Sequence, residues 1–445
     1  MTKETPANSS RTDADGLTAS CLSLASAYYL RNDGDFNGLP LAHIEVAKRC
    51  PWSELQQALT DLVEAGAAHV HWSDVDVNPH INRRGFAPKA AQVEHLKKLH
   101  GAEYYTCLYP SEKVLKATLP VGAYADKPYT RELALGAAQI EYRSFELQVL
   151  EVYRNDPRYY YTCSDIGGSI CISSEHSEGD QQVRESDQVL VETFGFSYDE
   201  HRNRAVAIFV RYLHDLSAEH QQIWRARQLE GSHGLHPDYY RANVLGEWPE
   251  HVSLLEALCI EIWLINRMAE VIRKKPLFRQ DFGQHAEDRP KKLAFLIRPT
   301  LEEFNSAVLL LDKVLSDNIS TKFFEGAIPL ETETKRRDGK IEVRPKGTIT
   351  LLDEYLRSVY HTNNWSVWDA AIASLRRVRK LRQSPAHIVN EDVFDPEYAR
   401  QFRELCVEAY GALLALRTCL QRHAAVRRAG IEIPRALEEG KVWME

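Results

Sequence analysis

The chain has 445 residues, of which 44% are hydrophobic and 27% are charged, and its formal net charge is -8. These proportions are ordinary for a globular protein, and the length allows two or three domains with cores of their own. The negative charge excludes a uniformly basic coat for nucleic acid, so any contact with RNA must use a local basic patch. The eight cysteines are scattered and form no CxxC pair, which gives no support for a zinc ribbon or a redox motif.

No segment has the character of a secretory signal or of a membrane span. Residues 1–16 are polar and lack the apolar core of a signal, and we expect them to form a disordered arm. The most apolar stretch, residues 254–265, contains Glu256 and Glu261 and therefore predicts a core helix. Scattered cysteines in a long chain are typical of reduced thiols, so we expect a cytoplasmic protein with no membrane contact.

Residues 17–100 predict a domain in which three helices precede two strands. Ser53, followed by Gln56 three positions later, has the pattern of a capping box at the start of the third helix, and Gly66 ends that helix. The expected helices are residues 17–30, 41–49 and 53–66, and the expected strands are residues 67–72 and 75–81. This order resembles a winged helix.

A winged helix implies DNA binding through its third helix, but the charges on that helix disfavour this function. The helix carries Glu54, Asp61 and Glu64, and it has no Lys or Arg between Ser53 and Gly66. An acidic helix is repelled by phosphate rather than attracted to it. The sequence therefore favours a module that binds a regulatory protein partner, and a DNA-binding regulator stays as an alternative.

The middle of the chain, residues 101–246, predicts an α+β domain with an antiparallel sheet. Residues 159–163 and 169–172 flank Asp165-Ile166-Gly167-Gly168, which is a strong hairpin signal. Residues 189–196 and 205–212 are two further apolar runs rich in β-formers. His214 and His220, near Glu219, are a weak metal candidate, because a site needs three or four convergent ligands; we expect no metal. The ligand of this domain does not follow from its sequence.

The rest of the chain, residues 247–445, predicts a helical domain. Thr300 and Glu303 form a second capping box, and Asp338-Gly339 marks a small basic hairpin at residues 332–345. The expected helices are residues 249–274, 300–318, 350–361, 367–382 and 396–423. The chain as a whole is thus expected to be a multidomain α+β protein.

The end of one of these helices carries the strongest functional signal in the sequence. Five of the seven residues from Arg376 to Arg382 are basic, and His387 follows after a proline at position 385. On an unbroken helix Arg382 and His387 would point about 140° apart, but a proline ends or kinks the helix and allows them to converge. Arginine suits a phosphate, and histidine moves protons near neutral pH.

An arginine followed by a polar residue, here Gln383, and by a histidine with four to six residues between the arginine and the histidine resembles the HEPN family. The resemblance implies an all-α bundle and a metal-independent endoribonuclease of a toxin or antiviral defence system, with no cofactor. It implies that His387 acts as general acid or base and that Arg382 stabilises the phosphate. It also implies a homodimer through the C-terminal helices. The RNA backbone would be held by Gln383, Arg379, Lys380 and Arg376.

The bare motif is common, so a second interpretation stays open. The pattern also allows five intervening residues, and three further pairs have this spacing: Arg227 with His233, Arg279 with His285, and Arg417 with His423. We interpret Arg417 as ordinary surface polarity. Many HEPN-like domains have lost catalysis. The helical domain is therefore also compatible with a non-catalytic dimeric scaffold or interaction protein.

Overall fold

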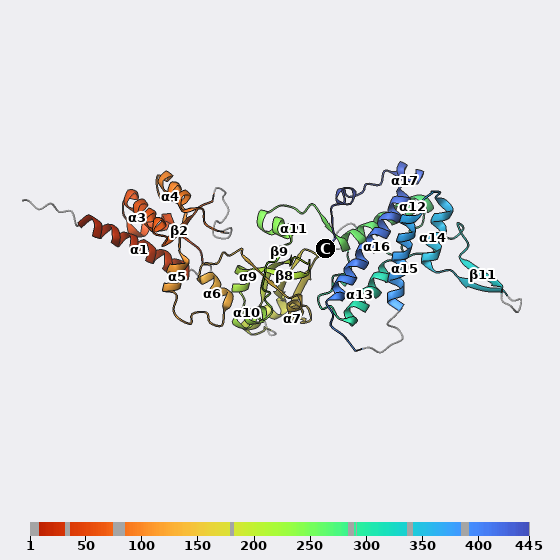
Figure 1. The fold of residues 1–445 in the computed structure, drawn as a ribbon, viewed down its shortest axis with the longest axis horizontal. Helices are drawn as coiled ribbons and strands as arrows, with labels where there is room; N and C mark the ends of the chain where they lie inside the picture. Colours follow the sequence, from red (N-terminus) through yellow and green to blue (C-terminus); the bar gives the residue numbers. More distant parts are fainter. Residues whose placement is uncertain are drawn as a thin grey trace, which may run out of the picture. The chain divides into compact units, whose positions relative to one another are not determined.

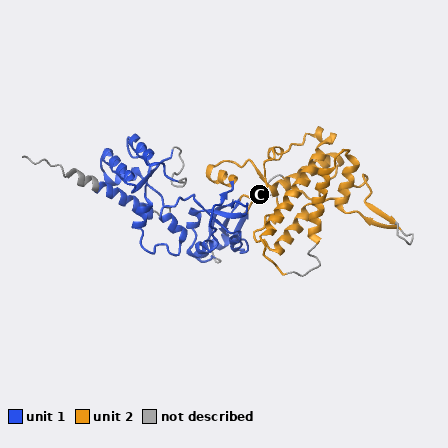
Figure 2. Cartoon of the chain, in the orientation of Figure 1, with its two compact units in different colours: residues 1–162, 167–236 blue, residues 163–166, 237–445 orange. Residues whose placement is uncertain are grey.

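The computed structural model is mixed α and β, with antiparallel sheets and a helical C-terminal part, as the sequence predicts (Figure 1). It describes residues 9–31, 36–73, 85–178, 182–283, 289–290, 292–335, 341–383 and 391–444. The chain divides into two compact units (Figure 2). One unit contains residues 1–162 and 167–236, and the other contains residues 163–166 and 237–445. A further division of the first unit near residue 100 stays a prediction.

The N-terminal part of the first unit is a small three-stranded sheet with helices around it. Its strands are β1 (Leu39–Pro40), β2 (Ala68–His71) and β3 (Cys107–Pro110), and β3 pairs antiparallel with both of the others. The helices are α1 (Ser9–Arg31), α2 (Leu41–Lys48), α3 (Trp52–Glu64) and α4 (Lys89–Lys98). The strand predicted at residues 75–81 lies outside the described residues, and the observed partner of β2 is β3.

Two expectations for this region are corrected by the structure. The helix α1 begins at Ser9, so residues 9–16 are helical rather than part of a disordered arm; this stretch has no proline to stop a helix. The capping box at Ser53 was also wrong. Pro51 is the N-cap, and its carbonyl accepts from the Leu55 N–H, while the Gln56 side chain donates to backbone carbonyls at the end of α4. Gly66 does end α3, with φ +66°.

The rest of the first unit is an antiparallel sheet with short helices. In the described part of the chain its strand order is β4-β8-β7-β6-β5, with β9 beside β7. Its strands are β4 (Tyr142–Phe145), β5 (Tyr159–Cys163), β6 (Gly167–Ile172), β7 (Leu190–Tyr198), β8 (Arg204–Phe209) and β9 (Gly234–Leu235). The helices include α5 (Glu112–Thr118), α6 (Pro128–Ala134), α7 (Glu151–Arg154), α9 (Val210–His214) and α10 (Ala218–Arg225). The predicted hairpin and the apolar strand at residues 189–196 are thereby confirmed, whereas the run at residues 205–212 is a strand only as far as Phe209, and Val210 begins α9.

The second unit is a bundle of long helices around one apolar core (Figure 1). The long helices are α12 (Leu254–Arg273), α13 (Leu301–Val314), α14 (Thr348–Val359), α15 (Ser366–Gln383) and α16 (Glu397–Gln421). Smaller elements are α11 (Pro237–Tyr240), α17 (Ala424–Ala429), α18 (Arg435–Glu438), the parallel pair β10 (Val252–Ser253) and β13 (Val442–Trp443), and the hairpin of β11 (Glu331–Lys335) and β12 (Ile341–Pro345). The Thr300 hydroxyl accepts from the Glu303 N–H at 3.3 Å, which confirms a cap at the start of α13.

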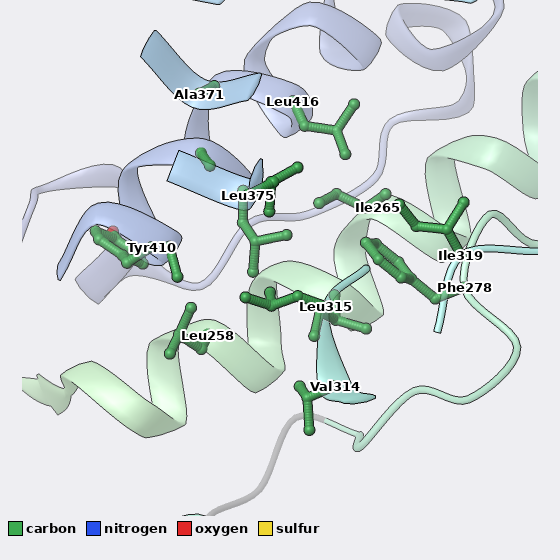
Figure 3. Packing of buried hydrophobic residues seen from close by; sticks show 14 of the residues in the cluster. Leu258, Ile265, Phe278, Val314, Leu315, Ile319, Ala371, Leu375, Tyr410 and Leu416 are labelled. Atoms are coloured by element: carbon green, nitrogen blue, oxygen red, sulfur yellow. The ribbon is translucent and has the colours of Figure 1, made fainter. Parts of the chain in front are cut away.

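The core of this bundle joins residues from helices that are far apart in the sequence. Leu258 and Ile265 of α12 lie in the same cluster as Leu375 of α15 and Leu416 of α16 (Figure 3). All four side chains are at most 5% exposed. Their burial is the main stabilising contribution to the packing of these helices.

The ion pair between Arg417 and Glu261 lies inside this core. The Arg417 Nε donates to Glu261 Oε2 at 2.6 Å, and the two side chains are 6% and 0% exposed. The expectation that Arg417 contributes ordinary surface polarity was therefore wrong. Its position on the buried face of α16 follows from the apolar stripe beside it, Leu413, Leu416 and Leu420.

No helix within the described ranges combines the length and the apolar character that are needed to cross a bilayer.

Candidate functional site

The C-terminal end of α15 carries the predicted site arginines. Its apolar residues Ile372, Leu375 and Val378 recur every three positions and are buried, which turns the cations toward the flanks of the helix. Arg379 and Arg382 are three positions apart and therefore lie on the same side of the helix. Their side chains are 28% and 30% exposed.

Both arginines contact the same two aspartates, Asp312 in the last turn of α13 and Asp317 in the turn that follows the helix. Arg379 donates from Nε to Asp312 Oδ1 at 2.9 Å and from Nη2 to Asp317 Oδ1 at 2.7 Å. Arg382 donates from Nη1 to Asp312 Oδ2 at 2.6 Å and also to Asp317. The Asp312 side chain is fully buried, while Asp317 is 36% exposed. We call these four residues the Arg–Asp cluster.

The Arg–Asp cluster explains why a fully buried carboxylate can persist inside the bundle. A buried charge is costly unless it is paired and hydrogen-bonded, and Asp312 accepts from two guanidinium groups. The hydrogen bond to Asp312 is also the main cause of the raised pKa of Arg382. The cluster thus links α15 to α13.

The two arginines use different edges of their guanidinium groups. Arg379 donates hydrogen bonds from its Nε and Nη2, which form the edge best suited to two parallel hydrogen bonds. Arg382 donates hydrogen bonds to the aspartates from Nη1 alone. Within the part of the chain that the structure describes, its Nε and Nη2 have no hydrogen-bond partner. Arg382 is therefore anchored at Nη1, and no described residue occupies its bidentate edge.

The remaining predicted RNA-binding residues are partly neutralised. Arg376 Nη2 lies 3.8 Å from Asp353 Oδ2, and the neighbouring Arg377 is paired with Glu408. Lys380 and Gln383 are exposed, and neither forms an ion pair or a side-chain hydrogen bond with another described residue. The basic run of α15 is thus not a continuous positive stripe.

His387, the other predicted catalytic residue, lies in residues 384–390, outside the described part of the chain. The structure brings Arg379 and Arg382 together, and the convergence of Arg382 with His387 stays a prediction. The sequence analysis missed Asp312 and Asp317. A signal was available for Asp312, because it follows Phe304, Val308 and Leu311 on the buried face of α13, where an acid requires a cation.

The weak metal candidate in the first unit has other contacts. His220 Nδ1 lies 2.8 Å from the Tyr153 hydroxyl, which also accepts from Trp224 Nε1, and burial lowers the pKa of His220. His214 Nε2 lies 3.2 Å from Asp215 Oδ1. Among the described residues no group of three or more His, Cys, Asp or Glu is arranged to hold a metal ion. Both histidines belong to the packing of α9 and α10.

Comparisons with known proteins give no relative for this chain: no family model, no curated protein and no solved structure matches it.

Proposed function

We propose that the second unit is a HEPN-like domain that cleaves RNA without a metal ion. The observation that carries the proposal is the guanidinium of Arg382, which Asp312 and Asp317 hold at Nη1 while its Nε and Nη2 edge has no described partner. That edge matches the geometry of two phosphate oxygens. His387 follows Arg382 by five positions on the segment that leaves α15.

In this proposal the two residues divide the chemistry of phosphodiester cleavage. His387 takes the proton from the ribose 2′-hydroxyl, and the 2′-oxygen attacks the phosphorus. Arg382 stabilises the negative charge that builds on the phosphate oxygens as the 5′-oxygen leaves, and the departing 5′-oxygen takes a proton from water. The products are a 2′,3′-cyclic phosphate and a 5′-hydroxyl.

The charges of the Arg–Asp cluster limit how strongly this site binds RNA. The formal charges of the two arginines and the two aspartates sum to zero, so the cluster orients the Arg382 guanidinium but provides no net attraction for RNA. Attraction must come from cations around it, such as Lys380 and Arg376. We therefore expect modest affinity that falls as salt concentration rises, and cleavage that depends on the position of Arg382 more than on binding.

The proposal is tested with the purified full chain and a labelled single-stranded RNA in excess chelator. The parent is expected to cut, and His387→Ala and Arg382→Ala are each expected to reduce the rate at least about 100-fold. Arg400→Ala is the matched control. It removes an arginine of the same unit whose contacts are Glu397 and Glu404 on its own helix, and it should leave the rate unchanged.

The assignment of the site is wrong if His387→Ala or Arg382→Ala cuts as fast as the parent. Full inhibition by chelator would also contradict it, because a metal would then supply the chemistry.

A second candidate function, a non-catalytic scaffold, is supported by the same cluster. Arg379 and Arg382 are each paired with two carboxylates, which gives both residues a complete role in joining α15 to α13. This candidate predicts a folded chain with no RNA cleavage, and Arg382→Ala would then change only stability. The two functions therefore differ in whether the parent cuts at all.

For the N-terminal part of the first unit we propose a winged-helix-like interaction module. The antiparallel strand order in the sheet, β1-β3-β2, supports this likeness, as do the helices α2 and α3, which lie between β1 and β2 in the chain. A departure is α4, which lies between β2 and β3 where a winged helix has a loop. The acidic residues Glu54, Asp61 and Glu64 are all exposed on α3, which favours a protein partner over DNA.

A further inference from the structure

The hairpin of β11 and β12 is a two-stranded sheet in the helical unit. Its register pairs Glu333 with Val343, and Thr332 and Thr334 with Arg344 and Glu342. Figure 1 shows it extending away from the helices near α14. Val343 is 49% exposed and Ile341 is 63% exposed, so neither apolar side chain is buried in the bundle. An isolated two-stranded hairpin of this kind is only marginally stable in water.

Each strand of this hairpin also has an outer edge that no other described strand covers. Backbone N–H and C=O groups along such an edge can pair with a strand of another chain. Proteins often protect an edge of this kind with short strands, charged side chains, prolines or bulges, and β12 carries Glu342, Arg344 and Pro345. The side chains of β12 show which partner fits.

We propose that β12 pairs antiparallel with β12 of a second copy of this chain, about a two-fold axis at Val343. This arrangement places Glu342 opposite Arg344 of the other copy, twice, because the two residues are equally distant from Val343. Val343 then lies opposite its own copy, and Ile341 lies opposite Pro345. Strand β12 is thus complementary to itself in charge and in apolar character, as a two-fold interface requires.

The contacts within one copy are consistent with this arrangement. Glu342 and Arg344 point to the same face of the strand, and they already form an ion pair of 2.6 Å. The arginine is 73% exposed and the glutamate 24% exposed, so the Arg344 guanidinium is the partner that can reach a second copy without unfolding of the hairpin. The apolar residues Ile341 and Val343 lie on the opposite face, where pairing brings Val343 beside its copy and Ile341 beside Pro345 of the other chain and reduces their contact with water.

The edge of β11 does not offer the same match. Pairing of β11 with itself about its middle residue places Glu333 opposite Glu333, and like charges directly opposite each other are destabilising. The proposal therefore concerns the β12 edge, and the occupant is a second copy of this chain. It does not depend on the proposed cleavage of RNA, and it differs from dimerisation through the helices.

The test is a set of charge reversals measured by sedimentation or light scattering at about 100 µM chain. The parent is expected to have twice the 50.9 kDa mass of one chain. Glu342→Arg alone and Arg344→Glu alone each put like charges together and should give single chains. An equal mixture of these two variants should form a heterodimer, and the double variant E342R/R344E should again form a homodimer.

A second measurement reports the two-fold axis itself. Val343→Cys places a thiol opposite its own copy, within the Cα separation of an antiparallel pair that a disulfide can bridge, so mild oxidation should yield a linked dimer that the parent does not form. A parent that stays a single chain overturns the proposal. Dimers that both single reversals leave intact overturn it as well, because the interface then lies elsewhere. A mixture of the reversals that fails to associate has the same consequence.

Discussion

Replacing Arg417 with methionine is the most informative perturbation of the helical unit. Methionine keeps much of the side-chain volume but removes the cation that lies 2.6 Å from Glu261. The Glu261 side chain is fully buried, and its Oε1 has no other hydrogen-bond partner in the described residues. Removing one partner of a buried ion pair costs about 3–5 kcal/mol, because the other charge remains without compensation. We therefore expect Arg417→Met to lower the unfolding free energy of the bundle by about 3–5 kcal/mol at neutral pH.

The loss should depend on pH in a defined direction. Burial raises the pKa of Glu261 above its ordinary value of 4.5, against the opposing effect of Arg417. A carboxyl whose pKa is higher in the folded state binds more protons there, so its contribution to stability is fully present below 4.5 and is lost as the pH rises through the folded value. Without Arg417 the folded pKa of Glu261 rises further. The penalty of Arg417→Met should therefore be smaller at pH ~5 than at pH ~7.5.

Hydrogen exchange measured on peptides of α12 and α16 localises this effect to the bundle. The double variant E261L/R417M is the control, because apolar side chains of similar size often replace a buried ion pair without loss of stability. The double variant should recover most of the protection of α12 and α16 from hydrogen exchange. Its stability relative to the parent should not show the pH dependence expected for Arg417→Met. A loss below about 1 kcal/mol for Arg417→Met, or a penalty that grows as the pH falls, would refute the reasoning.

Two further substitutions test local features of the fold. Gly168→Ala should destabilise the first unit by about 3 kcal/mol in urea unfolding, because the added Cβ meets the Thr162 carbonyl oxygen at 2.0 Å. Gly411→Ala is the control: a Cβ added at this position meets no atom within 4 Å, so this variant should not destabilise the chain. Thr300→Ala removes the hydroxyl that accepts from the Glu303 N–H and should cost about 1 kcal/mol, whereas Thr300→Ser should retain the cap; equal stability of the two variants would contradict its role.

Much of the fold followed from local patterns in the sequence. The helix predicted at residues 367–382 is observed as α15, Ser366–Gln383, because Ile372, Leu375 and Val378 repeat with the period of a helix that buries one face. The capping box at Ser53 failed because Pro51 ends the preceding loop with a fixed φ and starts α3 one residue earlier. A local motif identifies a helix start only when no neighbour competes for it.

The candidate site was less accessible to sequence analysis. Asp312 lies 67 residues from Arg379 and 70 from Arg382, so their contacts depend on the packing of α13 against α15. The sequence showed a basic helix end, and the structure shows that a buried acid holds two of its arginines. Arg417 shows the same limit, since its partner Glu261 lies 156 residues away.

The central claim is that the Nε and Nη2 edge of the Arg382 guanidinium contacts the phosphate that is cut. The substitution Arg382→Lys tests this claim most directly. Lysine keeps the charge beside Asp312 and Asp317, so the fold should be retained, but it lacks the pair of parallel donors. The initial rate of RNA cleavage in chelator should fall at least about 100-fold with little change in thermal stability. A parent that does not cut RNA, or a lysine variant that cuts at the parent rate, would contradict the account.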